Sequence, residues 1–495
     1  MNFPRSSGVL FHPTSLPGGQ GIGDLGREAY RFVDWLVSAG QSYWQVLPLN
    51  PTGFGDSPYQ GFSACAGNHF LISLDLLAQQ GLIAESALPP SGRGANVDFG
   101  MVFQSKTELL RRAFKGFREK APQWMKDRFG SFCGSIRNRW LEDYALFRAL
   151  KDHFGGRPWP QWDAELVHRD GKALEKWSRQ LAEDVLFHKW LQFEFFRQWS
   201  ELRAYAAQNG VSIIGDAPIF VAHDSADVWA HQGMFRLDGS GNPTHVAGVP
   251  PDYFSATGQL WGNPLYNWDA LASTGFRWWI ERFRVLLTMV DSVRLDHFRG
   301  FEAYWEIPGG EPTAVNGRWV KAPGQALLAA LKKSLGRLPI IAEDLGVITP
   351  EVEALRDGFG LPGMRILQFG FEEGPASNHL PHNHGRNTVV YPGTHDNDTL
   401  AGWHKSVDEK VRASVLRYTG DPSEPLPWNV IRMAYASVAD LAVIPMQDLL
   451  GLGNEARMNF PGKPSGNWTW RLKPGALLSE LAKRLLDLNR TYARI

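Results

Sequence analysis

The sequence predicts an α/β fold, a (β/α)8 TIM barrel that carries a large, mostly helical inserted subdomain. Short apolar runs alternate with helical segments along the 495 residues, which is typical of a parallel sheet covered by helices. Acidic residues follow several of these runs, and in a barrel all the strand ends open onto one face. An open doubly wound sheet, the alternative, would use mainly the crevice at its switch point. A chain of this length forms one domain only as a barrel with large insertions.

The first predicted unit is strand–helix–strand. Residues 9–11 form a short apolar strand, and residues 43–49 (YWQVLPL) form a second one. Between them, Asp24 is expected to cap a helix whose apolar residues recur at helical spacing, and Gly40 closes it.

Residues 61–209 do not follow the alternation of strands and helices. Long charged and aromatic helical segments at 106–120, 140–154 and 181–209 are joined by loops rich in proline and glycine. We interpret this stretch as an inserted, mostly helical subdomain that follows an early strand of the barrel.

The strand–helix alternation then resumes and continues to the end of the chain. Further buried strands are expected at 211–214, 289–293, 338–342, 364–369, 388–391 and 441–444, and helices at 325–335 and 475–488. The whole chain, 1–495, is therefore interpreted as a single catalytic barrel.

Composition excludes several classes of protein. Acids and bases balance at 51 each, so no nucleic-acid partner is expected. Cys65 and Cys133 cannot form a disulfide framework. There is no signal-like N-terminus and no apolar run of about 18 residues, so no membrane contact is expected. We expect a soluble cytoplasmic enzyme. Most of the 20 tryptophans are expected to pack the core and the insertion, although carbohydrate sites also use flat aromatic faces, on which sugar rings stack.

Two familiar patterns fail in context. Residues 21–26 (GIGDLG) match a dinucleotide fingerprint, but the preceding strand ends near residue 11 and no acid follows at about 20 residues. His382 and His384 lack a third ligand at suitable spacing. Neither a cofactor nor a metal is predicted.

Three carboxylates carry the chemical prediction. Arg294 and Asp296 alternate along a strand and so share a face, where the guanidinium would keep a nucleophilic carboxylate ionised; a structural ion pair is the alternative. Glu343 ends an apolar strand, where desolvation would raise its pKa and suit it as a general acid. Asp396 follows the strand at 388–391 in a polar loop, although any strand-end loop would be polar.

As a set, these acids fit glycoside chemistry with retention. That reaction needs a nucleophile and an acid/base about 5–5.5 Å apart, together with hydrogen bonds to sugar hydroxyls. Three acids on three strand ends of one barrel supply all three functions.

Nine segments between residues 7 and about 470 resemble the 4-α-glucanotransferases (amylomaltases or disproportionating enzymes), glycoside hydrolase family 77, relatives of the α-amylase barrels. They are SGVLFHPTSLP (7–17), GIGDLG (21–26), WQVLPLNPTGFGDSPYQ (44–60), IIGDAPIFVAHDSADVW (213–229), GVPPDYFSATGQLWGNPLY (248–266), VRLDHFRGF (293–301), AEDLG (342–346), GTHDNDT (393–399) and ARMNFPG (456–462).

The resemblance implies a function for each matching residue. Asp296 would be the nucleophile, Glu343 the acid/base, and Asp396 the residue that grips ring hydroxyls and helps distort the sugar. The segment 248–266 would cover the acceptor site. The remaining substrate-binding residues implied are Tyr59, Asp216, Asp252, Gln259, Trp261, Arg294, His395 and Asn467.

The implied reaction transfers an α-1,4-glucan segment from a donor to the 4-hydroxyl of an acceptor glucan or glucose. Its partners would be maltooligosaccharides and starch or glycogen chains, with no cofactor. An α-amylase-type retaining hydrolase is the alternative within this fold, and a catalytically inactive glucan-binding protein is an alternative of another class. Phe99 and Phe103 stand where tyrosines are expected, which puts a second glucan groove in doubt. Like the family, the chain has no room for a C-terminal β-sandwich.

Overall fold

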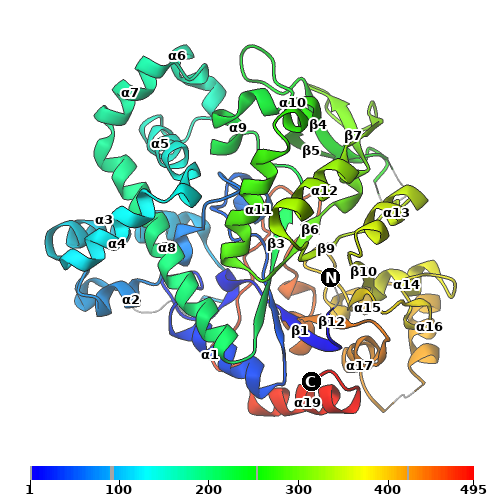
Figure 1. The fold of residues 1–495 in the computed structure, drawn as a ribbon. Helices are drawn as coiled ribbons and strands as arrows, with labels where there is room; N and C mark the ends of the chain where they lie inside the picture. Colours follow the sequence, from blue (N-terminus) through cyan, green and yellow to red (C-terminus); the bar gives the residue numbers. More distant parts are fainter. Residues whose placement is uncertain (1–2, 90–93, 252–254, 421–422) are drawn as a thin grey trace.

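The computed structural model describes residues 3–89, 94–251, 255–420 and 423–495, and its core is a parallel β-barrel (Figure 1). In the described part of the chain, eight parallel strands form one sheet in the order β10-β11-β12-β1-β2-β3-β6-β9. Spatial neighbours therefore follow one another along the chain, and β12 returns to pair with β1. The strands are β1 (Ser6–Leu10), β2 (Tyr43–Gln45), β3 (Ser212–Pro218), β6 (Ser292–Asp296), β9 (Ile340–Ala342), β10 (Gly363–Ile366), β11 (Thr388–Tyr391) and β12 (Leu441–Pro445). The predicted barrel is confirmed.

The barrel closes between β9 and β10 without a regular ladder. Both strands are fully described, and the sheet order ends at them. The Ala342 N–H donates to Pro362 O at 2.9 Å, and the Asp344 carboxylate Oδ1 accepts from the Met364 N–H at 2.6 Å. We call this junction, residues 342–344 against 362–365, the seam.

The strands agree with the prediction in position and differ at their ends. The strand at 388–391 is found as predicted, whereas β6 begins at Ser292 because Met289 still belongs to the preceding helix. The run at 364–369 divides, since a helix begins at Leu367. The first helix begins at Arg27 after the N-cap residue Gly26, and Asp24 accepts from the Gly26 N–H instead of capping the helix.

The helices outside the region 61–209 lie between and after the barrel strands in the chain. They are α1 (Arg27–Ser38), α9 (Ala226–Ala230), α10 (Trp268–Ser273), α11 (Arg277–Met289), α12 (Gly324–Leu335), α13 (Pro350–Gly358), α14 (Leu367–Glu373), α15 (Leu400–Ser406), α16 (Glu409–Thr419), α17 (Trp428–Ala436), α18 (Met446–Leu449) and α19 (Ser479–Thr491). In α1 the buried Ala29, Phe32, Val33 and Leu36 form one stripe, as an amphipathic helix on a sheet requires. No described helix is long and apolar enough to span a membrane.

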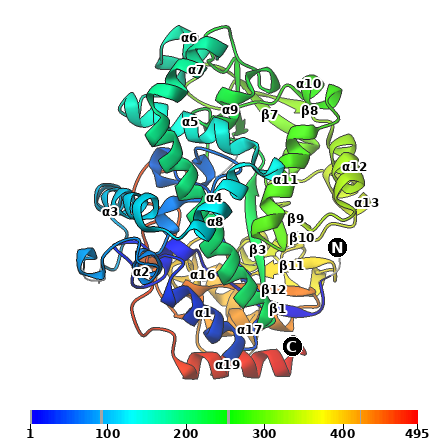
Figure 2. The ribbon, with the colours of Figure 1, turned by 60° about the vertical axis from the view of Figure 1, so that its left-hand side comes forward.

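The helices of the region 61–209 stand on one side of the barrel (Figure 2). They are α2 (Leu74–Gln79), α3 (Phe99–Lys120), α4 (Gln123–Cys133), α5 (Trp140–His153), α6 (Ala164–Val167), α7 (Gly171–Gln180) and α8 (Ala182–Gln208). The long helix α8 also packs on the barrel. Its Trp199 lies 6.4 Å, between ring centroids, from Trp44 of β2, and the Trp199 indole donates to Met289 O at 2.7 Å.

A small antiparallel sheet, which the sequence did not predict, lies at one end of the molecule. Its order is β5-β4-β7-β8, and part of it lies in the segment 248–266. The strands are β4 (His245–Val249), β5 (Gln259–Pro264), β7 (Ala303–Pro308) and β8 (Arg318–Lys321). Its buried Glu306 is held by Arg318 at 2.8 Å and by Arg236. Charges, glycines and prolines in these strands hide the apolar alternation that normally indicates a sheet.

The two ends of the described chain meet beneath the barrel. The Arg5 Nε donates to Tyr492 O at 2.8 Å, and the Arg494 Nη1 donates to Ser6 O at 2.9 Å. Arg494 is fully buried and donates to further main-chain carbonyls of Ala434, Tyr435, Ser437, Ala439 and Asp440. The first strand, β12 and the end of the chain are thereby joined.

Candidate active site

Asp296 is the last residue of β6 and is held by an arginine from the same strand. Arg294 Nη1 lies 3.0 Å from Asp296 Oδ1 and 2.8 Å from Asp216 Oδ2. Arg294 and Asp216 are direct partners in the ladder between β3 and β6. The Asp296 side chain keeps 28% of its surface exposed, whereas that of Asp216 is fully buried. The carboxylate of Asp296 is thus presented from the end of a strand and remains partly exposed.

Burial and charge oppose each other at this pair. Burial raises the pKa of Asp296, and so does the nearby Asp396, while Arg294 lowers it; the net pKa is above the ordinary aspartate value. The expected effect of Arg294 is present, but burial outweighs it. Burial and Asp296 raise the pKa of Asp216 to about 7 against the effect of Arg294, and the Tyr59 hydroxyl donates to Asp216 Oδ2 at 3.0 Å.

Glu343 follows β9 directly and is oriented by main-chain donors. The N–H of His297, the residue after Asp296, donates to Glu343 Oε2 at 2.6 Å, and the N–H of Leu345 donates to Oε1 at 3.1 Å. His297 can aim its N–H this way because its backbone is left-handed, with φ 53°. Burial raises the pKa of Glu343 well above its ordinary value, with a contribution from the charge of Asp296. The raised pKa suits Glu343 as a proton donor.

Asp396 lies in the loop after β11 and is the most open of the three acids, with 42% of its side chain exposed. Asn459 Nδ2 donates to its Oδ1 at 2.6 Å, and His395 Nε2 lies 3.4 Å from the same oxygen. Arg457 Nη2 donates to the Asp396 carbonyl at 2.6 Å. Burial lowers the pKa of His395 to about 4, so its ring is neutral at physiological pH.

Aromatic side chains border this group. Tyr59 stacks on His395, with ring centroids 5.2 Å apart and planes at 11°. On the small sheet, Trp261 meets the His297 ring edge-on at 4.8 Å, and its indole donates to Gln259 Oε1 at 3.2 Å. Flat rings and amide groups around carboxylates are the usual composition of a sugar site.

Electrostatic coupling links residues that lie far apart in the chain. The pKa of Tyr59 is raised, first by burial and then by the charges of Asp216, Asp296 and Asp396. The pKa of Glu343 responds to Arg294 and Asp296. The predicted acids of three strand ends are thus brought to one face of the barrel together with Tyr59.

Other predicted residues have different places. Asp252 lies outside the described residues. Asn467 uses its side chain within its own loop, where Oδ1 accepts from the Phe460 N–H and Nδ2 donates to Lys463 O, each at 2.9 Å. Among the described residues, no group of three or more His, Cys, Asp and Glu is arranged to hold a metal ion.

The contacts of Asn459 and Arg457 with Asp396, and the main-chain donors of His297 and Leu345, were not predicted from the sequence. The segment ARMNFPG (456–462), which contains Asn459 and Arg457, stands among the segments of family resemblance, but nothing in it indicates which carboxylate its polar side chains would meet.

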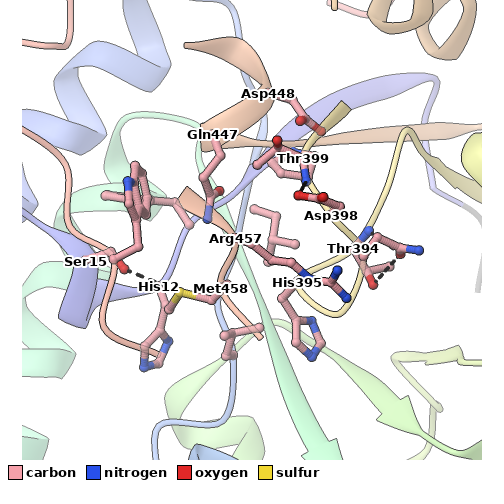
Figure 3. A pocket seen from close by; sticks show the side chains of 16 residues that line it. His12, Ser15, Thr394, His395, Asp398, Thr399, Gln447, Asp448, Arg457 and Met458 are labelled. Atoms are coloured by element: carbon pink, nitrogen blue, oxygen red, sulfur yellow. Dashed lines mark hydrogen bonds between the residues drawn. The ribbon is translucent and has the colours of Figure 1, made fainter. Parts of the chain in front are cut away.

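A small polar cavity adjoins the site beside His395 (Figure 3). It measures about 30 Å³ and is lined by His12, His395, Asp398, Asp448 and Arg457, among others. Such a volume holds about one or two water molecules and no sugar ring. None of the three predicted catalytic carboxylates lines it.

Comparisons with known proteins agree along the whole chain. A family described as 4-alpha-glucanotransferase matches residues 11–478. The 4-alpha-glucanotransferase of Thermus thermophilus is 55% identical over 100% of both chains, and that of Synechocystis sp. is 51% identical over 99% of this chain and 98% of its own. The structure of amylomaltase from Streptococcus agalactiae in complex with acarbose covers 99% of both chains at 43% identity, with a TM-score of 0.95.

Proposed function

The chain belongs to the 4-alpha-glucanotransferase family, and we propose that Asp296, Glu343 and Asp396 carry out its reaction. The protein transfers a segment of α-1,4-glucan from a donor to the 4-hydroxyl of an acceptor glucan or glucose, with retention of configuration. The observation that carries the residue assignment is the single group formed by three strand-end acids. Arg294 bonds Asp296, and the neighbouring His297 N–H bonds Glu343.

In the first step, Asp296 attacks C1 of the donor sugar while Glu343 gives its proton to the glycosidic oxygen. The bond between C1 and that oxygen breaks, the leaving chain departs with a free 4-hydroxyl, and a glycosyl ester forms on Asp296. The raised pKa of Glu343 supports its function as the acid. The contact with Arg294 at 3.0 Å supports an ionised Asp296.

In the second step, the acceptor 4-hydroxyl attacks C1 and gives its proton to the Glu343 carboxylate. The ester to Asp296 breaks and the α-linkage is restored. Asp396, fixed by Asn459, would hold ring hydroxyls as the sugar flattens. If water replaced the acceptor, the same step would be hydrolysis, so transfer requires that a sugar be held in place and water be disfavoured.

The substrate-binding assignments rest on position around these acids. Tyr59 and Trp261 would stack on sugar rings. Gln259 would lie on the loop that covers the acceptor site, His395 would assist in sugar binding, and Asn467 would contact the sugar. Asp216 would support Arg294 from below. Asp252 belongs to the same proposal. Of these contacts, the stacking of Tyr59 on His395 and the Trp261–His297 edge contact give the strongest support.

We further propose that residues 1–495 act as one catalytic barrel, that 61–209 is an inserted helical subdomain, and that 248–266 covers the acceptor side. Trp261, which lies in the last segment, contacts the turn after Asp296, and this contact supports the covering function. A cytoplasmic location is proposed as well, and it fits the free thiols of Cys65 and Cys133.

Incubation with maltotriose tests the reaction. Transfer yields glucose together with a ladder of longer maltooligosaccharides, and the total number of reducing ends stays constant. A steady rise in reducing ends without longer products would instead indicate an α-amylase-type hydrolase.

Azide with α-maltotriosyl fluoride tests the residue assignment, because the product's stereochemistry tells the two functions apart. In Asp296→Ala, azide should displace fluoride directly and give the inverted β-glycosyl azide. In Glu343→Ala, azide should attack the glycosyl ester and give the retained α-azide. The reverse pattern would exchange the two assignments, and wild-type activity in either variant would remove that residue from the mechanism.

A further inference from the structure

Two acids follow β9, and the mechanism uses only the first. Successive residues of an extended chain point to opposite sides, so Asp344 faces away from the mouth toward α13 and β10. It is almost fully buried, with 1% of its side chain exposed. A buried carboxylate next to the acid/base residue requires a physical reason for its presence.

Asp344 occupies the place where the barrel lacks its ladder. Its Oδ1 accepts from the Met364 N–H of β10 at 2.6 Å. Its Oδ2 lies 3.2 Å from Arg365 Nη1 and also bonds Arg356 of α13. One carboxylate thus joins the end of β9 to the next strand and to the helix that precedes it.

Gly363 shows how closely this contact is built. A Cβ at residue 363 would lie 2.5 Å from Asp344 Oδ2 and 2.9 Å from Oδ1, well inside van der Waals contact. The start of β10 therefore has room for the carboxylate only because residue 363 is a glycine.

We propose that Asp344 is a positioning residue for Glu343: by closing the seam, it fixes the backbone from which Glu343 reaches the glycosidic oxygen. The inference rests on the proposed acid/base function of Glu343. The N–H of Leu345, the residue after Asp344, donates to the Glu343 carboxylate. In the chain, Asp344 therefore lies between Glu343 and a donor that orients Glu343. A shift of the backbone at 344 would move both.

The charge of Asp344 affects the pKa of Glu343, so the pH dependence of activity can reveal an effect that a purely packing function of Asp344 would not produce. Glu343 is faced by Arg294, Asp296 and Asp344, and the negative charge of Asp344 adds to the burial that raises the pKa of Glu343. Asp344 itself is faced by Arg356 and Arg365. The pKa of His379 is lowered by burial, and the negative charge of Asp344 acts against this lowering.

Asp344→Asn and Arg365→Gln test the proposal through opposite shifts. Asp344→Asn removes a negative charge near Glu343, so the pKa of Glu343 falls and the alkaline limb of the kcat profile moves to lower pH. Arg365→Gln removes a positive charge, so this limb moves to higher pH. In Asp344→Asn, kcat for maltotriose should also fall about 10- to 100-fold while KM changes little, because Glu343, which would be displaced, acts in the transition state.

Asp357→Asn is the matched control, since Asp357 contacts Arg356 at 2.8 Å but is exposed; its profile should equal that of the wild type. Folded Asp344→Asn with unchanged kcat or an unmoved alkaline limb would overturn the proposal. If Asp344→Asn does not fold, Arg365→Gln decides, and a limb that stays in place or moves downward overturns the proposal. Failure of the assignment of Glu343 is distinguishable, because it would leave Glu343→Gln active.

Discussion

At the scale of single residues, the three acids differ in what surrounds them, and this difference supports the separate functions proposed for them. Asp296 is paired with a guanidinium, Glu343 with two main-chain N–H groups, and Asp396 with an amide and a neutral imidazole. Two carboxyl groups whose environments favour different protonation states are the usual basis of acid and nucleophile functions in one site.

The first prediction concerns pH. Activity should rise as Asp296 ionises and fall as Glu343 loses its proton, and both pKa values are raised, first of all by burial. Arg294 lowers both, so Arg294→Gln should move both limbs of the kcat/KM profile to higher pH. It should also reduce kcat by about 100-fold or more.

Glucose release from maltotriose across the pH range measures this profile. Arg294→Lys keeps the charge and serves as the control, with smaller shifts of both limbs. Limbs that stay in place in Arg294→Gln would show that the guanidinium does not set these protonation states.

The second prediction concerns Asn459, which donates to Asp396 at 2.6 Å. Asn459→Ala removes a hydrogen bond to a charged group, worth about 1.5–3 kcal/mol, so kcat should fall about 10- to 100-fold, with a smaller change in KM. Steady-state kinetics with maltotriose measures the effect. Asn454→Ala is the control, because Asn454 makes a similar bond at 2.7 Å to Asp398. Equal losses in both variants would contradict a specific function of Asn459.

The residue scale also shows where sequence reasoning stops. That Asp296, Glu343 and Asp396 lie on one face of the barrel could be predicted, because strand ends in a barrel converge whatever the loops do. The position of Asn459 could not, since its contact with Asp396 depends on the path of a loop. For the same reason the two hydrogen bonds of the Asn467 side chain within its own loop could not be predicted from the sequence.

At the scale of strands and helices, the seam is the element that we propose to fix the position of Glu343. The third prediction is that Gly363→Ala lowers stability by about 1–3 kcal/mol, the usual cost of overpacking, because the added Cβ would meet Asp344 at 2.5 Å. Thermal unfolding measures the loss, and kcat should fall with it. Gly358→Ala in α13 is the control, because nothing lies within 4 Å of its added Cβ. Equal melting temperatures for the two variants would contradict the close fit of the seam.

Strands that are buried on both faces could be predicted, whereas the small sheet could not. The barrel strands are continuous apolar runs, such as the fully buried β11 and β12, and need no partner to be recognised. In β7 (AYWEIP) and β8 (RWVK), charged residues stand next to tryptophans. Their pairing depends on the buried ion pairs of Glu306, which only the folded chain reveals.

At the scale of the whole molecule, one buried arginine joins the first and last parts of the barrel. The fourth prediction is that Arg494→Lys lowers the free energy of unfolding by about 3 kcal/mol or more. The lysine ammonium cannot donate to all the carbonyls that accept hydrogen bonds from the Arg494 guanidinium. Each buried acceptor left without a donor costs about 1–3 kcal/mol.

Denaturant or thermal unfolding of Arg494→Lys measures this loss. The exposed Arg490 of α19 gives the control variant Arg490→Lys, which should unfold like the wild type. Activity at low temperature should survive in both variants, because Arg494 lies at the end of the barrel opposite the carboxylates. A stable Arg494→Lys would show that the hydrogen bonds beneath the barrel are dispensable.

The contact between residues 5 and 492 makes circular permutation of the chain possible. A short peptide could link the two ends, and new ends could be opened elsewhere without cutting the barrel. The turn at Gly155 and Gly156 in the helical region is a suitable place, because both glycines have open space around them. Such a circular permutant would begin and end on the helical side, so a fused domain could be carried there instead of beneath β1 and β12.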